Sequence, residues 1–451
     1  MKRQAGFLVM ALFVCLWTGE AAAAKPTPRP SGGLTVSPYF GSKMVLQRDM
    51  PVPVFGTATP GATVTVEFNG KFKNETVLTS GKWKVVLDPM DATFTGDDLV
   101  ITSGSTTITL EDVLVGEVWV LSGQSNAWFP LWKCDGGTDA VNGSGSYPMI
   151  RMFQAGSASS PWSVSSPTTS PYWSGVGYFF ARDLVDKMSE DVPIGIYQLA
   201  VNGTGINQWI VGGRQYNNLI APLQPMAIRG VLWYQGEDDT GKTSLANAYY
   251  QNLPKLITGW RTAWGQGDFP FYIVQLALIS GRPNYAIVRD AQVTTTMTVA
   301  NTWLACIIDI PTIPATDIHP TNKEPVGQRL ALIARANLYG DPDLVYYGPI
   351  RDPASSYVDG SSVVVGFNYV DGGFLTTGEA HPSPFTVAGP DGVYYDAMAE
   401  VAGNTVVVTS PSVSSPVSVR YGWASYPTCN LFNGYELPAS PFQMTVSSTA
   451  P

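Results

Sequence analysis

The chain has 451 residues, of which 45% are hydrophobic and 14% charged. This length exceeds one ordinary core and indicates two or three domains, while the composition excludes a disordered chain. The formal charge of −9, with no basic cluster to offset it, argues against nucleic acid as a partner.

The first residues are typical of an export signal. Lys2 and Arg3 precede an apolar run over residues 6–17, and small residues occupy positions 21–24. We therefore expect residues 1–24 to be a signal peptide, residues 25–33 a Pro/Gly linker, and the mature protein to be secreted or periplasmic. No later stretch is long and apolar enough to span a bilayer, so we expect no membrane partner after signal removal.

The β pattern comes first along the mature chain. Residues 34–112 predict a small β domain of short strands, with alternation over 64–68, a tight Asn-Gly turn at 69–70 and returning strands over 71–78 and 82–87.

Strands and helices then alternate from residue 113 to about residue 340. This order predicts an α/β domain in which a parallel sheet carries helices on both faces. The expected strands are 117–121, 194–200, 230–234, 271–276 and 303–309. The expected helices are 176–188 capped by Ser174, 244–264 interrupted at Pro254, and 324–339 closed by Gly340.

After residue 341 the pattern returns to β through residue 451, with strands expected at 362–370, 405–409 and 417–423. Three cysteines remain in the mature chain, Cys134, Cys306 and Cys429, so at most one disulfide can form and its pairing stays open. No Cys or His cluster has metal-ligand spacing, and we expect neither a metal nor a cofactor.

A candidate nucleophile follows the strand at 117–121. Ser125 lies just past the break at Ser122-Gly123, at the carboxyl end of a buried strand, where open α/β sheets keep their active sites. A serine hydroxyl is a weak nucleophile and needs a base. His319 is the better placed of the chain's two histidines, because it sits in Asp317-Ile-His-Pro directly ahead of a helix. Asp317 is the expected partner of the imidazole, and Asp309 is the fallback.

Other strand ends offer donors for an oxyanion. The strand ending at residue 200 leads into Asn202-Gly203-Thr-Gly, where glycine lets the backbone approach a ligand closely. The strand ending at residue 234 leads into Gln235-Gly-Glu237, and a side-chain amide there can donate to an oxyanion.

Three blocks carry a family resemblance. Gly123-Gln-Ser-Asn126, Trp233-Tyr-Gln-Gly-Glu237 and Asp317-Ile-His-Pro320 resemble the SGNH hydrolase superfamily, in particular its sialate O-acetylesterase-like branch. Residues 44–53 and 420–442 resemble that branch as well, so nearly all of the mature chain is covered.

The resemblance implies a flavodoxin-like catalytic domain flanked by N- and C-terminal β-sandwich-like domains. It also implies release of acetate from O-acetylated carbohydrates by a Ser-His-Asp mechanism. Ser125 would be the nucleophile, His319 the base and Asp317 its partner. The oxyanion hole would combine the Ser125 and Gly203 amides with the Gln235 side chain.

Two positions depart from the family pattern. The superfamily often shows Asp-x-x-His rather than the Asp-x-His found here, and the 202–209 loop carries Asn207 and Gln208 where an acidic residue is common.

Substrate contacts are predicted on weaker grounds. Trp128, Trp132 and Trp209 are candidates for stacking on a sugar ring, and Asn202 also lies in the strand-end loop. Glu237 is read as a hydrogen-bonded scaffold residue at the edge of the substrate site. Arg214 is the arginine nearest to a block and the candidate for a sialate carboxylate.

Several functions remain open at this point. Acetylated xylan or another plant polysaccharide is an alternative substrate to O-acetylated sialic acid. A non-catalytic carbohydrate-binding protein and a lipase-like esterase are further readings, although the polar 202–208 loop disfavours the second of these.

Overall fold

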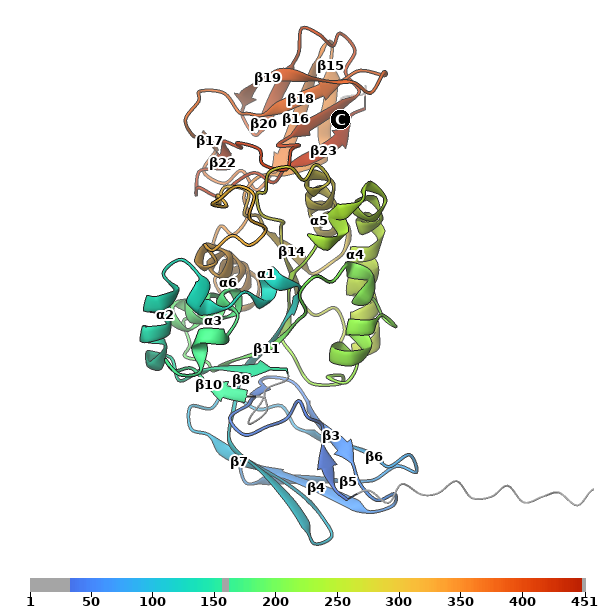
Figure 1. Cartoon of the computed structure of the whole chain (residues 1–451), viewed down its shortest axis with the longest axis vertical. Coiled ribbons are helices and arrows are strands. Elements are labelled where there is room, and N and C mark those ends of the chain that lie inside the picture. The colour runs from blue at the N-terminus through green and yellow to red at the C-terminus, as the bar shows by residue number, and fades with distance from the viewer. Residues whose placement is uncertain (1–32, 156–161, 448–451) are drawn as a thin grey trace, which may run out of the picture.

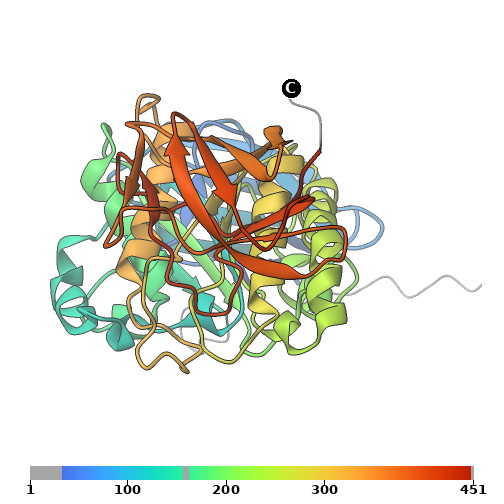
Figure 2. The same ribbon diagram turned by 90° about the horizontal axis from the view of Figure 1, so that it is seen from above.

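The computed structural model describes residues 33–155 and 162–447. The expected signal peptide and all of the expected linker except Gly33 lie outside these ranges. Three regions follow one another along the long axis of the molecule: an N-terminal β region, a central α/β region and a C-terminal β region (Figure 1). Viewed from above, the C-terminal strands lie over the central region (Figure 2). The expected α/β class with a β-rich C-terminal part is therefore confirmed.

The N-terminal region is built from short strands that pair antiparallel, except β2 (Val45–Gln47), which pairs parallel to β8 (Thr106–Gly123). Asn69 and Gly70 both have positive φ angles, 52° and 68°, and so form the tight turn that the Asn-Gly pair predicts. The strands are β1 (Thr35–Val36), β2 (Val45–Gln47), β3 (Val52–Thr57), β4 (Thr63–Phe68), β5 (Lys71–Thr76), β6 (Lys82–Leu87) and β7 (Asp97–Ser103).

One long strand joins the N-terminal and central regions. Strand β8 (Thr106–Gly123) pairs with β7 over its first half and lies in the centre of the large sheet over its second half. It crosses the expected boundary at residues 112 and 113 without a break. The division at this point therefore stays a prediction, because the two regions share a strand as well as one continuous hydrophobic cluster.

The central sheet has the order β10-β9-β11-β8-β12-β13-β14, and every pairing along this path except that of β10 is parallel. Its remaining strands are β9 (Ile150–Gln154), β10 (Trp162–Val164), β11 (Ile194–Ala200), β12 (Gly230–Tyr234), β13 (Phe271–Val274) and β14 (Thr302–Ala305). The five strand positions expected here are confirmed, with β13 and β14 ending earlier than predicted.

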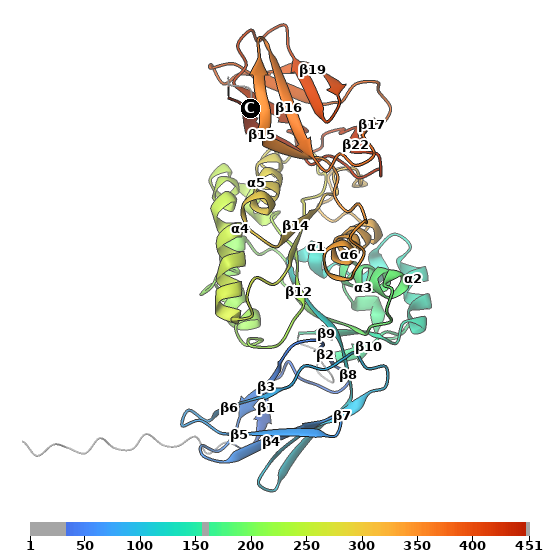
Figure 3. The same cartoon turned by 180° about the vertical axis from the view of Figure 1, so that it is seen from behind.

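Helices cover both faces of this sheet (Figure 3). They are α1 (Ser125–Trp128), α2 (Gly137–Gly143), α3 (Gly175–Lys187), α4 (Thr243–Trp264), α5 (Tyr285–Thr298) and α6 (Glu324–Leu338). Helices α3 and α6 pack on one face and α4 and α5 on the other. The Ser174 cap is confirmed, because its side chain accepts a hydrogen bond from the Gly177 amide.

The predicted interruption at Pro254 is wrong. Helix α4 runs unbroken through this residue. A proline removes one helical hydrogen bond, but Leu253, Leu256 and Ile257 beside it are fully buried. Tertiary packing of that apolar face therefore holds the helix together across the proline. Helix α5 was not expected from the sequence pattern.

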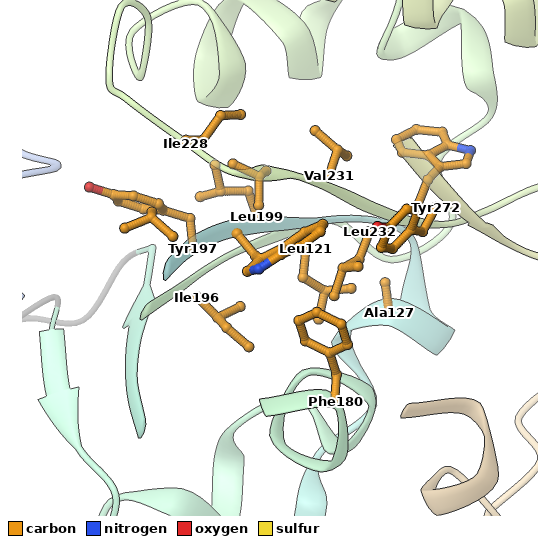
Figure 4. Packing of buried hydrophobic residues seen from close by; sticks show 14 of the residues in the cluster. Leu121, Ala127, Phe180, Ile196, Tyr197, Leu199, Ile228, Val231, Leu232 and Tyr272 are labelled. Atoms are coloured by element: carbon orange, nitrogen blue, oxygen red, sulfur yellow. The ribbon is translucent and has the colours of Figure 1, made fainter. Parts of the chain in front are cut away.

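Buried apolar side chains fill the space between the sheet and its helices. Phe180 of α3 lies on one side of the strands, and Ile228 and Val231 lie on the other (Figure 4). Trp119 of β8 contacts both Phe180 and Tyr272, with ring centroids 5.2 Å apart in each pair. The central strands are therefore buried on both faces, as parallel strands usually are.

The C-terminal region has a hydrophobic cluster of its own. Its strands are β15 (Ile350–Asp359), β16 (Ser362–Asn368), β17 (Phe374–Thr376), β18 (Phe385–Ala388), β19 (Tyr394–Ala402), β20 (Thr405–Thr409), β21 (Ser418–Tyr421), β22 (Leu431–Asn433) and β23 (Phe442–Thr445). The predicted strands at 362–370, 405–409 and 417–423 correspond to β16, β20 and β21. Within the described ranges no helix is long and apolar enough to cross a membrane.

Candidate active site

Three strands end at the same level of the central sheet. Gly123, the last residue of β8, is paired with Ala200 of β11 on one side and with Tyr234 of β12 on the other. Gly123 has a φ of +136°, and a Cβ at this position would collide with the carbonyl oxygen of Tyr234. Only glycine lets the strands approach this closely, and the loops that follow them consequently start side by side.

Ser125 opens helix α1 immediately after this edge. Its Oγ lies 2.8 Å from Nε2 of His319, which belongs to the loop between β14 and α6. The two residues are 194 positions apart in the sequence. The structure therefore brings the candidate nucleophile and the candidate base into hydrogen-bond contact, which is the geometry a serine nucleophile requires.

Asp317 contacts His319 in a different way from the one expected. Its Oδ1 accepts a hydrogen bond from the His319 backbone nitrogen at 2.9 Å and lies 3.8 Å from the imidazole Nδ1. The longer distance exceeds that of a hydrogen bond. Asp317 thus fixes the backbone of His319 by a hydrogen bond and places a negative charge near the imidazole ring. The fallback Asp309 accepts hydrogen bonds from the two terminal guanidinium nitrogens of Arg329, each at 2.6 Å, and does not serve the imidazole.

Burial and two nearby cations act against one nearby carboxylate on the pKa of the imidazole. Partial burial lowers the pKa of His319, and the cations Lys323 and Lys133 lower it further, while Asp317 raises it. The net direction is downward. A histidine with a lowered pKa is neutral at neutral pH and can accept the serine proton.

Two of the residues expected to supply oxyanion donors line the pocket. Ser125 and Gly203 line the same pocket, and neither backbone amide donates to another residue within the described ranges. Gly203 has a φ of +62°, a backbone conformation that favours glycine.

Gln235 does not fit its expected role and requires a correction. The side chain is fully buried, and its Nε2 lies 2.7 Å from Asp239 Oδ2, 3.0 Å from the Thr204 carbonyl and 3.2 Å from Gln124 Oε1. An amide with two hydrogens and these acceptors has no donor left for an oxyanion. Gln235 instead connects the loops after β8, β11 and β12 by hydrogen bonds.

Loops from all five central strand ends line the pocket around Ser125. The loops contribute Gln124 and Ser125 after β8, Asn202 and Gly203 after β11, Glu237, Asp238 and Gly241 after β12, Arg282 after β13, and Ile318 and His319 after β14. Arg282 is exposed. Two acidic residues and one arginine therefore line the same pocket as the serine–histidine pair.

The tryptophans expected to stack on a sugar differ in their surroundings. Trp209 is fully buried, its Nε1 donates to Thr204 Oγ1 at 2.9 Å, and its ring packs edge-on against Trp233. It therefore cannot face a substrate, and that prediction is wrong. Trp128 and Trp132 are 38% and 47% exposed, so each has ring surface open to solvent. Arg214 is exposed but does not line the pocket.

Metal and thiol chemistry find no support in the described ranges. These residues contain no group of three or more His, Cys, Asp or Glu side chains that could hold a metal ion. Cys134, Cys306 and Cys429 are all free cysteines. Burial raises the pKa of each thiol to about 12, which leaves them protonated and unreactive.

Sequence reasoning missed three residues at this site. Asn126, next to Ser125, donates to Glu237 Oε1 at 2.5 Å and to the Ile318 carbonyl at 2.9 Å. Lys323 donates to Asn126 Oδ1 at 2.6 Å. Asn126 is the last residue of the recognised block Gly123-Gln-Ser-Asn126, and Lys323 follows soon after the block that ends at Pro320, so both positions carried a signal. Arg282 had none, because the helix that follows it was not predicted.

Comparison with known proteins identifies the family of the chain. Residues 115–333 match the family model described as carbohydrate esterase, sialic acid-specific acetylesterase. The crystal structure of a carbohydrate acetylesterase from Xanthomonas citri is 36% identical in sequence, with a TM-score of 0.82 over 91% of this chain and 99% of that one. The chain belongs to the sialate O-acetylesterase-like carbohydrate esterases.

Animal members of this esterase family are similar over most of their length. Human sialate O-acetylesterase is 27% identical over 420 residues, covering 76% of this chain and 77% of the human protein. The mouse enzyme is 28% identical over 417 residues. As a member of the family, the protein is a carboxylic ester hydrolase, and Ser125 and His319 lie within the segment that the family model matches.

Proposed function

We propose that the protein is a secreted serine esterase that removes acetyl groups from O-acetylated carbohydrates. The observation that carries this proposal is the 2.8 Å contact between Ser125 Oγ and His319 Nε2, two residues that line the same open pocket. Secretion rests on the signal-like residues 1–24. The carbohydrate substrate rests on the family and on its relatives' names.

The proposed reaction uses these side chains in the positions described above. His319 Nε2 takes the proton of Ser125 as Oγ attacks the acetyl carbonyl carbon. The resulting oxyanion accepts hydrogen bonds from the Ser125 and Gly203 amides. Collapse of this intermediate breaks the ester bond, and His319 returns the proton to the departing sugar oxygen. Water, deprotonated by the same imidazole, then releases acetate and restores Ser125.

Asp317 completes the proposed triad through charge and backbone contact. A negative charge 3.8 Å from Nδ1 stabilises the imidazolium that forms when His319 takes the serine proton. A shift of less than 1 Å would convert this contact into a hydrogen bond, which catalytic groups often tighten only with substrate bound.

The sheet supports a flavodoxin-like assignment for the catalytic region. Leaving aside the outer pair β9 and β10, the strands β11, β8, β12, β13 and β14 follow the order 2-1-3-4-5. This is the doubly wound order of flavodoxin-like folds, whose ligands bind beyond the carboxyl ends of the strands. We propose that the N- and C-terminal β regions flank this catalytic unit as sandwich-like domains.

Acetate release tests the proposal directly. Purified protein is incubated with O-acetylated sialic acid and with acetylated xylan, and acetate is measured for wild type and for Ser125→Ala. We expect release by the wild type and a loss of at least about 10³-fold in the variant. Release that persists in Ser125→Ala would exclude the serine mechanism. Glycan binding without any acetate release would instead favour a non-catalytic carbohydrate-binding protein.

Acyl-chain preference distinguishes an acetylesterase from a lipase-like enzyme. The pocket lining contains only one large aliphatic side chain, Ile318, and is otherwise polar or small. We therefore expect p-nitrophenyl acetate to be hydrolysed far faster than the octanoate ester. Equal rates with both esters would contradict an acetyl-specific site.

A further inference from the structure

A buried lysine lies directly behind the nucleophile and has no place in the mechanism above. Lys323 precedes helix α6, is fully buried, and donates to Asn126 Oδ1 at 2.6 Å. Its ammonium lies 5.1 Å from the ring centroids of both Phe129 and Tyr234. Burying a charged ammonium is costly, so its presence beside an active-site serine needs an explanation.

The ammonium determines which way the Asn126 amide points. Lys323 can only donate a hydrogen bond, and the Ile318 carbonyl can only accept one. The amide oxygen must therefore face Lys323 while Nδ2 faces Ile318 and Glu237, as observed. In a flipped amide the NH2 group would face an ammonium and the oxygen would face two further acceptors.

The oriented amide connects three elements of the site. Asn126 itself directly follows Ser125 in α1, Ile318 directly precedes His319, and Glu237 belongs to the loop after β12. The peptide unit between Ile318 and His319 is held on both sides. Asn126 donates to its carbonyl oxygen, and Asp317 accepts from its N–H group. The distance between nucleophile and base therefore depends on one amide side chain.

The Lys323 charge also acts on the base. It lowers the pKa of His319, whereas Asp317 raises it. Glu237 and Asp317 both stabilise the protonated lysine, while burial lowers the pKa of Lys323 to about 8. Other charged and titratable groups surround Lys323 and His319. They are Lys133, Cys134, Glu237, Asp238, Arg282 and Asp317.

Glu237 contributes one further feature to this arrangement. It is buried, burial raises the pKa of its carboxyl group, and its Oε2 has no hydrogen-bond partner among the described residues. Its Oε1 depends on the Asn126 amide. Without an oriented amide, both oxygens of a buried carboxylate beside Ser125 would lack partners, which is unfavourable.

We infer that Lys323 is a positioning residue for the esterase reaction: it orients the Asn126 amide, which joins the segment of Ser125 to the segment of His319. This inference rests on the proposed serine esterase function. It assigns Lys323 no contact with substrate, since Lys323 does not line the pocket. Its removal should therefore affect turnover and pH dependence more than substrate affinity.

Lys323→Met tests the inference, with p-nitrophenyl acetate as substrate. We expect kcat to fall by about 10- to 100-fold, as for small displacements of reacting groups, and KM to change by less than about twofold. Loss of the cation should raise the pKa of His319, so the acid limb of the kcat/KM profile should move to higher pH. Near-UV circular dichroism checks that the variant is folded.

Lys133→Met is the matched control. Lys133 is exposed and its charge also lowers the pKa of His319, but it makes no contact with Asn126. We expect kcat to stay within about twofold of wild type, with at most a small shift of the acid limb because solvent screens an exposed charge. An equal loss of kcat in Lys133→Met and Lys323→Met would overturn the positioning role.

A double-mutant cycle with Asn126→Ala separates the two residues. If Lys323 acts through the Asn126 amide, adding Lys323→Met to Asn126→Ala should lower kcat by less than a further factor of about two. Independent, multiplicative losses would overturn the inference. If Lys323→Met alone fails to fold, the comparison of Asn126→Ala with the double variant remains: a further loss of kcat above about twofold would overturn the inference.

The outcome is separable from that of the proposed function. Wild-type hydrolysis that is lost in Ser125→Ala, together with a folded Lys323→Met variant of unchanged kcat and acid limb, would overturn the inference alone. Absence of any wild-type hydrolysis would overturn both.

Discussion

Asp317 Oδ1 lies 2.9 Å from the backbone nitrogen of His319 but 3.8 Å from Nδ1 of its ring. The aspartate therefore holds the peptide more tightly than the imidazole, and both side chains are partly exposed to solvent. This contact differs from the buried aspartate–histidine hydrogen bond of a typical serine triad, in which loss of the correct partner costs about 10⁴-fold.

We predict that Asp317→Asn lowers kcat/KM by only about 10- to 100-fold, well short of that value. The acid limb of the pH profile should move to lower pH, because Asp317 raises the pKa of His319 and its charge is removed. Steady-state kinetics between pH 4 and about 8 would measure both effects. A shift to higher pH would contradict the electrostatic role of Asp317.

Asp309 should affect stability and leave the chemistry intact. Its carboxylate accepts two hydrogen bonds from Arg329 at 2.6 Å, and Arg329 also donates to the Cys306 carbonyl. We predict that Asp309→Asn lowers the free energy of unfolding by about 2 kcal/mol, because a charge-assisted pair is lost. Thermal unfolding would show this loss while kcat remains within about twofold of wild type. A 100-fold fall in kcat with unchanged stability would mean that Asp309 serves the imidazole.

Truncation of Trp209 should affect stability, whereas truncation of Trp128 should affect substrate binding. Trp209 is fully buried, so Trp209→Ala should lower the free energy of unfolding by about 3–5 kcal/mol. Trp128 lies at the end of α1 with an exposed ring, and Trp128→Ala should raise KM for an acetylated oligosaccharide with little loss of stability. Chemical denaturation and substrate titration would separate the two. An unchanged KM in Trp128→Ala would remove this residue from the substrate site.

Arg282 is the cation best placed to meet an acidic sugar. It lines the pocket with Ser125 and is exposed. If the substrate carries a carboxylate, Arg282→Gln should raise KM for O-acetylated sialic acid by about tenfold, the loss expected for one charge-assisted hydrogen bond, and leave acetylated xylan unaffected. Arg214→Gln, which alters an exposed arginine away from the pocket, is the matched control. Equal effects on both substrates would argue against carboxylate recognition.

Local sequence patterns predicted much of the scaffold. The alternation of buried strands and amphipathic helices placed β11, β12, α3 and α6 closely, because side-chain period and capping residues act within a few positions. The same logic located Ser125, since a hydroxyl just past a buried strand lies at the carboxyl edge of a parallel sheet. Pro254 shows the limit of local reasoning, because burial of its neighbours outweighs the lost hydrogen bond.

Local sequence was enough to identify the chemical groups of the site: a serine at one strand end, a histidine before a helix and an aspartate two residues away from that histidine. Tertiary structure decided what each group contacts. In the folded chain Asp309 pairs with Arg329, and Trp209 is buried. The Gln235 amide donates toward acceptors in neighbouring loops, and Lys323 donates to Asn126. Orientation and burial depend on partners up to about 200 residues away, such as Asn126 and Lys323, which are 197 positions apart. No local pattern encodes such pairings, because they arise only when the sheet brings its strand ends together.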